Sequence, residues 1–208
     1  MSLLLVGAPI WGAPGADVID RVLAVVDRAI ITRSDVLVAM RLNLGRLSGV
    51  PAPATEAEAL QRQIERRLML TEVDRYAPPE PPAAEIDRRL ADVRGTVGSD
   101  TELERLLEQV GLTMERLRRI LRDDLRLEAY LDQRFGVGLQ PSEEDIVAYY
   151  QAHRDRFSSG GAVRPLADVH DDVKAALVAE RRPVQIAAWV SGLRRRADIL
   201  ILADVKRH

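Results

Sequence analysis

A short apolar run near the carboxyl end of the chain, residues 199–202 (ILIL), has the composition of a β-strand but lies far from every other strand candidate. An isolated strand would leave its backbone N–H and C=O groups without partners, so this run must pair with a second strand. The runs 22–26 (VLAVV) and 30–32 (IIT) are the remaining candidates, and residues 27–29 can join them as a hairpin. The sequence therefore predicts that both ends of the 208-residue chain meet in one small antiparallel sheet.

Between these strands the apolar residues recur with the period of α-helices. Residues 83–97 show this most clearly, and the apolar residues of 113–135 are so many that this helix is expected to bury more than one side. A last helix from about residue 166 contains Pro183, which would kink or break it. The fold class predicted is mainly α, with a small antiparallel β-sheet formed by an N-terminal hairpin and the C-terminal strand. Side chains that can cap a helix start precede five of these helices: Ser34, Thr55, Ser99, Thr113 and Ser142.

The amino terminus begins with an apolar run at residues 3–12 (LLLVGAPIWG). At about 1.5 Å of rise per residue, this run is too short to cross a membrane core of about 30 Å, so no stable membrane insertion is expected. Small residues follow at 13–16, as at a signal peptidase site, so residues 1–16 are predicted to be a signal peptide remnant of an exported protein. The alternative is a terminal arm or a strand packed on the domain. Residues 17–208 are expected to form a single domain, with a flexible linker at 158–165.

The composition disfavours most catalytic chemistry. The chain has no Cys and three His that are far apart in sequence, so no metal-ligand cluster is recognisable. It also has no Walker-type loop, Rossmann glycine pattern, HExxH or nucleophile elbow, so neither an enzyme activity nor a cofactor is predicted. The arginines of 116–126 alternate with acidic residues and the formal net charge is −2, so nucleic acid is not an expected partner. His153 and His170 are expected to have a structural role, in packing or in capping a helix, and not to bind a ligand.

Three segments carry a resemblance to a known family. Residues 18–36 contain the hairpin and an Ile-Thr-x-Ser-Asp entry to the first helix, 141–157 read PSEEDIVAYYQAHRDRF, and 166–202 contain the last helix and strand. In this order the segments resemble the SurA-type periplasmic chaperones, the trigger-factor-like SurA N-terminal family. Many relatives carry a parvulin prolyl-isomerase domain between the second and third segments. Here only residues 158–165 separate them, so the resemblance implies a chaperone core without isomerase activity.

The resemblance further implies an ATP-independent holdase in the periplasm that binds unfolded outer-membrane or secreted proteins in a groove between helices. Met adapts to varied shapes, and Tyr combines apolar area with a polar tip, so such residues are candidates for the groove walls. The alternative for each of them is plain core packing. The alternative function is a single-partner interaction or assembly module, for example a domain-swapped homodimer that exchanges its last helix and strand through residues 158–161. The candidate groove residues are Met40, Leu44, Leu47, Met69, Met114, Tyr149 and Tyr150.

Overall fold

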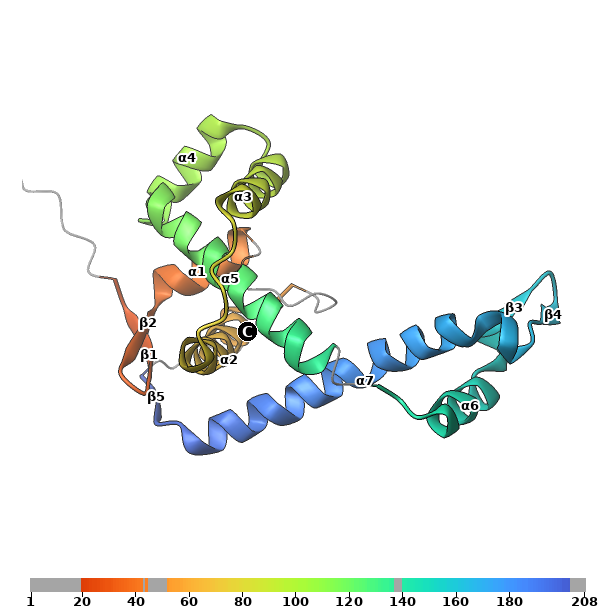
Figure 1. Cartoon of the computed structure of the whole chain (residues 1–208). Helices are drawn as coiled ribbons and strands as arrows, with labels where there is room; N and C mark the ends of the chain where they lie inside the picture. The colour runs from red at the N-terminus through yellow and green to blue at the C-terminus, as the bar shows by residue number, and fades with distance from the viewer. Residues whose placement is uncertain (1–19, 43, 45–51, 137–139, 203–208) are drawn as a thin grey trace, which may run out of the picture.

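The two ends of the chain meet in a three-stranded sheet. The computed structural model describes residues 20–42, 44, 52–136 and 140–202 (Figure 1). Strand β1 (Val22–Val26) lies between β2 (Ala29–Thr32) and β5 (Ile199–Ile201), and both pairings are antiparallel. At the hairpin turn, the Asp27 amide donates to the Asp198 carbonyl at 2.8 Å, and the Asp198 amide donates to the Asp27 carboxylate at 3.0 Å. The predicted antiparallel sheet between the two ends is confirmed.

Four helices pack with this sheet around the largest apolar core. Helix α1 (Arg33–Leu42) follows β2 directly, and α2 (Glu56–Tyr76) contacts the sheet, α1, α5 (Met114–Phe135) and α7 (Leu166–Arg196). Leu60, Ile64 and Val73 of α2 are fully buried there, together with Val26 of β1 and Leu131 of α5. Helix α2 is therefore the central helix of this part of the molecule, which we call the body (Figure 1).

A second apolar cluster joins a helical pair to the body. Helices α3 (Ala83–Val97) and α4 (Asp100–Gln109) pack with the first half of α5 and with α1, and Leu103, Leu117 and Leu121 are its most buried members. The second half of α5 contributes Leu127 and Leu131 to the body core. Helix α5 therefore buries more than one side, as its surplus of apolar residues predicts.

The third cluster forms an arm that projects from the body (Figure 1). The arm contains α6 (Glu143–Ala152), a 3-10 turn (Arg154–Phe157), the short strands β3 (Ser158–Ser159) and β4 (Ala162–Val163), and the first part of α7. Strands β3 and β4 pair as a hairpin, and Gly160 and Gly161 take the positive φ values its turn requires. The composition of 158–165 predicts a flexible linker, and the structure places this hairpin within that segment.

Four of the five predicted capping residues act as predicted. The side-chain oxygens of Thr55, Ser99, Thr113 and Ser142 each accept a hydrogen bond from the amide three residues later, at 3.1–3.2 Å. The prediction that Ser34 caps the first helix is wrong. The Thr32 hydroxyl accepts from the Asp35 amide at 3.3 Å, and the Asp35 carboxylate accepts from the Thr32 amide at 3.0 Å. This reciprocal pair is a capping box, which satisfies two backbone groups where a lone serine satisfies one.

Helix α7 runs through Pro183 without a break. Of the two outcomes expected at this proline, a broken helix is therefore excluded. Proline removes one backbone hydrogen bond from the helix interior but leaves the bonds of the neighbouring turns in place. The same helix therefore reaches from the arm to the sheet (Figure 1).

Candidate functional site

A groove of about 820 Å³ lies between α2, α5 and α7. Met69 of α2, Leu131 of α5 and Val190 of α7 form its apolar floor and are largely buried by their neighbours. The wall on α7 is more exposed and consists mainly of small or apolar residues. These wall residues recur at helical spacing on one face of α7: Ala179, Pro183, Ile186, Ala187 and Ser191.

Each charged side chain around this groove has an ion-pair partner within the chain. Arg182 of α7 forms an ion pair with Asp132 of α5, and Arg194 lies 3.5 Å from the Glu65 carboxylate of α2. Glu128 of α5 is bound by Arg89 of α3 at 2.5 Å. Since these charges are compensated within the chain, the property that the groove offers to a ligand is its apolar surface.

The structure does not bring the seven candidate groove residues together. Met69 lines the groove, Met40 packs against the body core, and Leu44 and Met114 pack against the second cluster. Tyr149 and Tyr150 are buried in the arm, and Leu47 lies outside the described residues. The six candidates that the structure describes are therefore distributed over three apolar clusters.

The two tyrosines have intramolecular partners for their hydroxyl groups. The Tyr149 hydroxyl donates to Glu180 at 2.8 Å and accepts from Arg156 at 2.6 Å, and burial raises its pKa. The Tyr150 hydroxyl donates to the Arg164 carbonyl at 2.6 Å. These bonds connect α6 to the 3-10 turn, to the residue that follows β4 and to α7, so both tyrosines hold the arm together.

His153 has the packing and capping role expected of it, whereas His170 forms hydrogen bonds with acidic side chains. His153 ends α6, where its ring stacks on Tyr149 with centroids 4.1 Å apart. His170 of α7 lies 2.9 Å from Glu143 at the start of α6, and this hydrogen bond raises its pKa. Both histidines therefore interact with residues of α6 in the arm.

The groove residues on α7 are the part of this site that sequence reasoning missed. Periodicity marks Ile186 and Val190 as apolar, and the natural interpretation is a core stripe. One signal could have distinguished a groove wall from a core stripe. The stripe continues through the small residues Ala179, Pro183 and Ala187, which leave room beside the helix. This pattern does not show which helix lies opposite α7 across the groove.

The described part of the chain shows neither a metal-ligand cluster nor a membrane-spanning helix. Within residues 20–42, 44, 52–136 and 140–202, no three His, Asp or Glu side chains are placed to hold a metal ion. None of the helices in these ranges is both long and apolar enough to cross a membrane. No protein-family model and no curated protein matches this chain.

Proposed function

We propose that this protein is an ATP-independent chaperone that holds unfolded polypeptide segments in the groove between α2, α5 and α7, and that it does so without prolyl-isomerase activity. The single observation that carries the proposal is the open apolar groove. Its volume of about 820 Å³ lies within the range of about 300–1,000 Å³ typical of ligand sites. Burial of a client's apolar side chains there would contribute about 25 cal/mol per Å², whatever their sequence.

The spacing of the ion pairs suggests the length of segment that this groove would hold. Arg182 and Arg194 are 12 positions apart on α7, which corresponds to about 18 Å of helix. An extended chain rises about 3.3 Å per residue, so about five or six client residues would lie between the two ion pairs. Met69 on the floor favours broad specificity, because its unbranched side chain adapts to different shapes.

The resemblance of the chain to SurA-type chaperones supports the same proposal and adds the compartment. In many of those relatives the isomerase is a separate domain, and only residues 158–165 stand at its position here. We therefore propose that the protein acts in the periplasm on unfolded outer-membrane or secreted proteins. Holding a client this way requires no nucleotide, since the free energy comes from apolar burial alone.

A single-partner assembly module is the second candidate, and the exposed edge of the sheet favours it. Leu200, Ile201 and Leu202 at β5 are each about half exposed, although they are large and apolar. Exposed apolar edge strands are templates for pairing with another chain. A module of this kind would bind one partner and would not suppress the aggregation of unrelated proteins.

Light scattering from an unfolded outer-membrane protein, with and without the purified chain, tests the proposal. Two neighbouring alanines on α7 provide a matched pair of variants, since Ala187 lines the groove, Ala188 does not, and both are exposed. Ala187→Asp places a charge where the client must bury apolar surface, so about fivefold more protein should be needed for the same suppression. Ala188→Asp should behave as the unmodified chain.

Three results would overturn the proposal. Scattering that is unchanged at several-fold excess of the chain would favour the assembly module. Equal suppression by the two variants would remove the groove from the mechanism. A parallel prolyl-isomerase assay should show no activity, and acceleration of isomerisation would contradict the proposed absence of that activity.

A further inference from the structure

A second, smaller pocket lies on the side of α2 away from the groove. Its volume is about 180 Å³, and no residue lines both sites. A cavity of about 150 Å³ lined by aliphatic and aromatic side chains accepts a benzene molecule. This pocket is therefore large enough for one aromatic ring or one branched aliphatic side chain. Its apolar walls come from β2, α1, α2 and α5, mainly Ile31, Val38, Ala39, Leu70 and Ile120.

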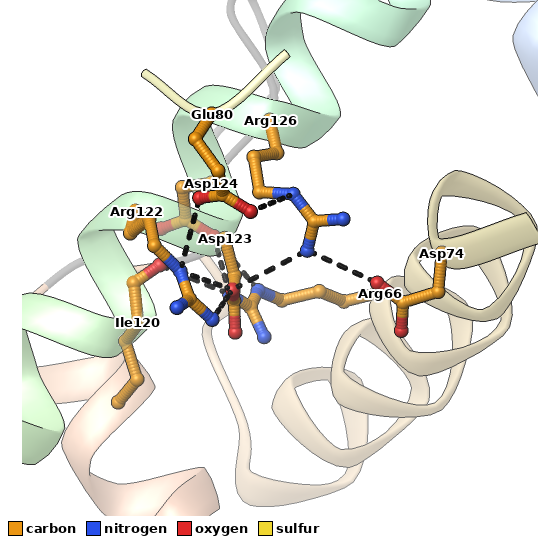
Figure 2. Close-up of polar contacts among 8 residues, drawn as sticks. All are labelled: Arg66, Asp74, Glu80, Ile120, Arg122, Asp123, Asp124 and Arg126. Carbon is orange, nitrogen blue, oxygen red and sulfur yellow. Dashed lines mark hydrogen bonds and ion pairs between the residues drawn. The ribbon is translucent and has the colours of Figure 1, made fainter. Parts of the chain in front are cut away.

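Most of the charged side chains at this pocket are held by partners within the chain. Arg116 donates to Asp35 at 2.7 Å, and Asp123 is bound by Arg122 at 2.8 Å. Figure 2 shows Arg66 reaching from α2 to α5, where it donates to Asp124 at 2.8 Å and to the Ile120 carbonyl at 3.2 Å. The charge of each of these groups is therefore compensated by a partner within the chain.

Arg67 differs from these residues. It lines the same pocket and is exposed, and its guanidinium has no hydrogen-bond or ion-pair partner among the described residues. The five charged side chains at the pocket are three arginines and two aspartates, so the pocket carries one surplus positive charge. A free guanidinium beside an apolar recess matches a ligand with one apolar group and one anionic group.

We propose that this pocket binds apolar carboxylates. The apolar group, of one-ring size, lies between α1, α2 and α5, and the carboxylate accepts two hydrogen bonds from the Arg67 guanidinium. A carboxylate fits better than a phosphate, because its single charge balances the surplus of one and its two oxygens match the guanidinium fork. The C-terminal residue of a polypeptide and a free small carboxylic acid share this chemistry. The proposal is independent of the chaperone activity, since the two sites share no residue.

The test is a chemical-shift titration of the full ¹⁵N-labelled chain with three probes. The first is a short peptide that ends in phenylalanine with a free carboxylate, the second is the same peptide as its C-terminal amide, and the third is 3-phenylpropionate. The free acid should bind about fivefold more tightly than the amide, which is the effect of one exposed charge pair. The shifted resonances should include the amides of Ile31, Arg67 and Leu70.

Two arginine variants make the test specific. Arg67→Gln should remove the difference between the acid and the amide while leaving binding of the amide unchanged. Arg105→Gln on α4 is the matched control, because Arg105 is also exposed and unpaired among the described residues but does not line the pocket. This control should bind all three probes as the unmodified chain does.

Each outcome decides the proposal. Preferential binding of the peptide acid assigns the pocket to chain ends, and equal binding of 3-phenylpropionate assigns it to small acids. Equal affinities for the acid and the amide, an unchanged preference in Arg67→Gln, or no shifts at about 10 mM probe would overturn it. Shifts confined to groove residues such as Met69 and Leu131 would also overturn it. If the chain failed to suppress aggregation in the scattering assay, the interpretation of these titration outcomes would be the same.

Discussion

The ion pair between Arg66 and Asp124 is the most buried charge pair that joins α2 to α5 in the described structure. Both side chains are only 13% exposed, and the closest nitrogen and oxygen are 2.6 Å apart (Figure 2). Replacing Asp124 by Asn keeps the shape but removes the charge, so the Arg66 guanidinium stays buried beside a neutral amide. Breaking a buried pair by removing one partner costs about 3–5 kcal/mol. Since some solvent reaches this pair, we expect Asp124→Asn to lower the free energy of unfolding by about 2–4 kcal/mol.

Urea unfolding followed by circular dichroism measures this loss, provided that the slope of the transition stays constant. Glu115→Gln is the control, because Glu115 pairs with Arg119 at 3.1 Å on the surface of α5 and their side chains are 86% and 57% exposed. This change should cost less than about 0.5 kcal/mol. The apolar double variant Arg66→Met with Asp124→Leu should be less destabilising than Asp124→Asn alone, since it buries no charge. A cost for Asp124→Asn no greater than that of Glu115→Gln would refute the argument that burial sets the strength of this pair.

Three further predictions concern the arm and α7. The pKa of His170 is raised above 6.5 by its hydrogen bonds to Glu143 and Asp171, so its contribution to stability is full below pH 6.5 and is lost as the pH rises through the folded-state pKa. The thermal midpoint should therefore fall more between about pH 6 and 8.5 in the unmodified chain than in His170→Gln, and equal pH profiles of the two would contradict this assignment. Ser142→Ala removes the acceptor for an amide of the first turn of α6 and should cost about 1 kcal/mol in urea unfolding, whereas no measurable cost would show that water replaces the cap. Pro183→Ala supplies the missing amide in the interior of α7 and should raise the free energy of unfolding by about 2 kcal/mol, so a destabilised variant would argue against a regular helix at this point.

The arrangement of the sheet could be predicted from the sequence because it follows from a local pattern and one general rule. Residues 199–202 have strand composition, and unpaired backbone groups require a partner strand. The helix starts at Thr55, Ser99, Thr113 and Ser142 were predictable for a similar reason, since each cap bonds to an amide only three residues away. The Thr32 and Asp35 box was missed because Ser34 is an equally good capping residue by composition.

The groove could not be predicted in the same way. Periodicity shows which residues of a helix are apolar, but not whether another helix covers them. Ile186 and Val190 lie on one stripe, yet Val190 is buried in the body core while Ile186 is only partly buried at the groove wall. Likewise, the apolar ring and polar hydroxyl of Tyr149 suggest a binding surface, but the hydroxyl is bound by Glu180, which lies 31 residues away in sequence. Contacts of this range depend on the tertiary packing and have no local signature.

The pairing of the chain ends contributes to the groove, because it holds the C-terminal end of α7 against the body. Residues 178–189, all of which the structure describes, include no buried side chain, although the partly buried Ile186 and Trp189 pack against the body core. The helix is fixed on one side by the arm cluster and on the other by Val190, Leu193 and the strand β5 that follows. Together with these contacts, the pairing of β5 with β1 fixes where the exposed face of α7 lies relative to α2 and α5. The short apolar run near the C-terminus thus positions one wall of the proposed binding site, although it contributes no residue to that site.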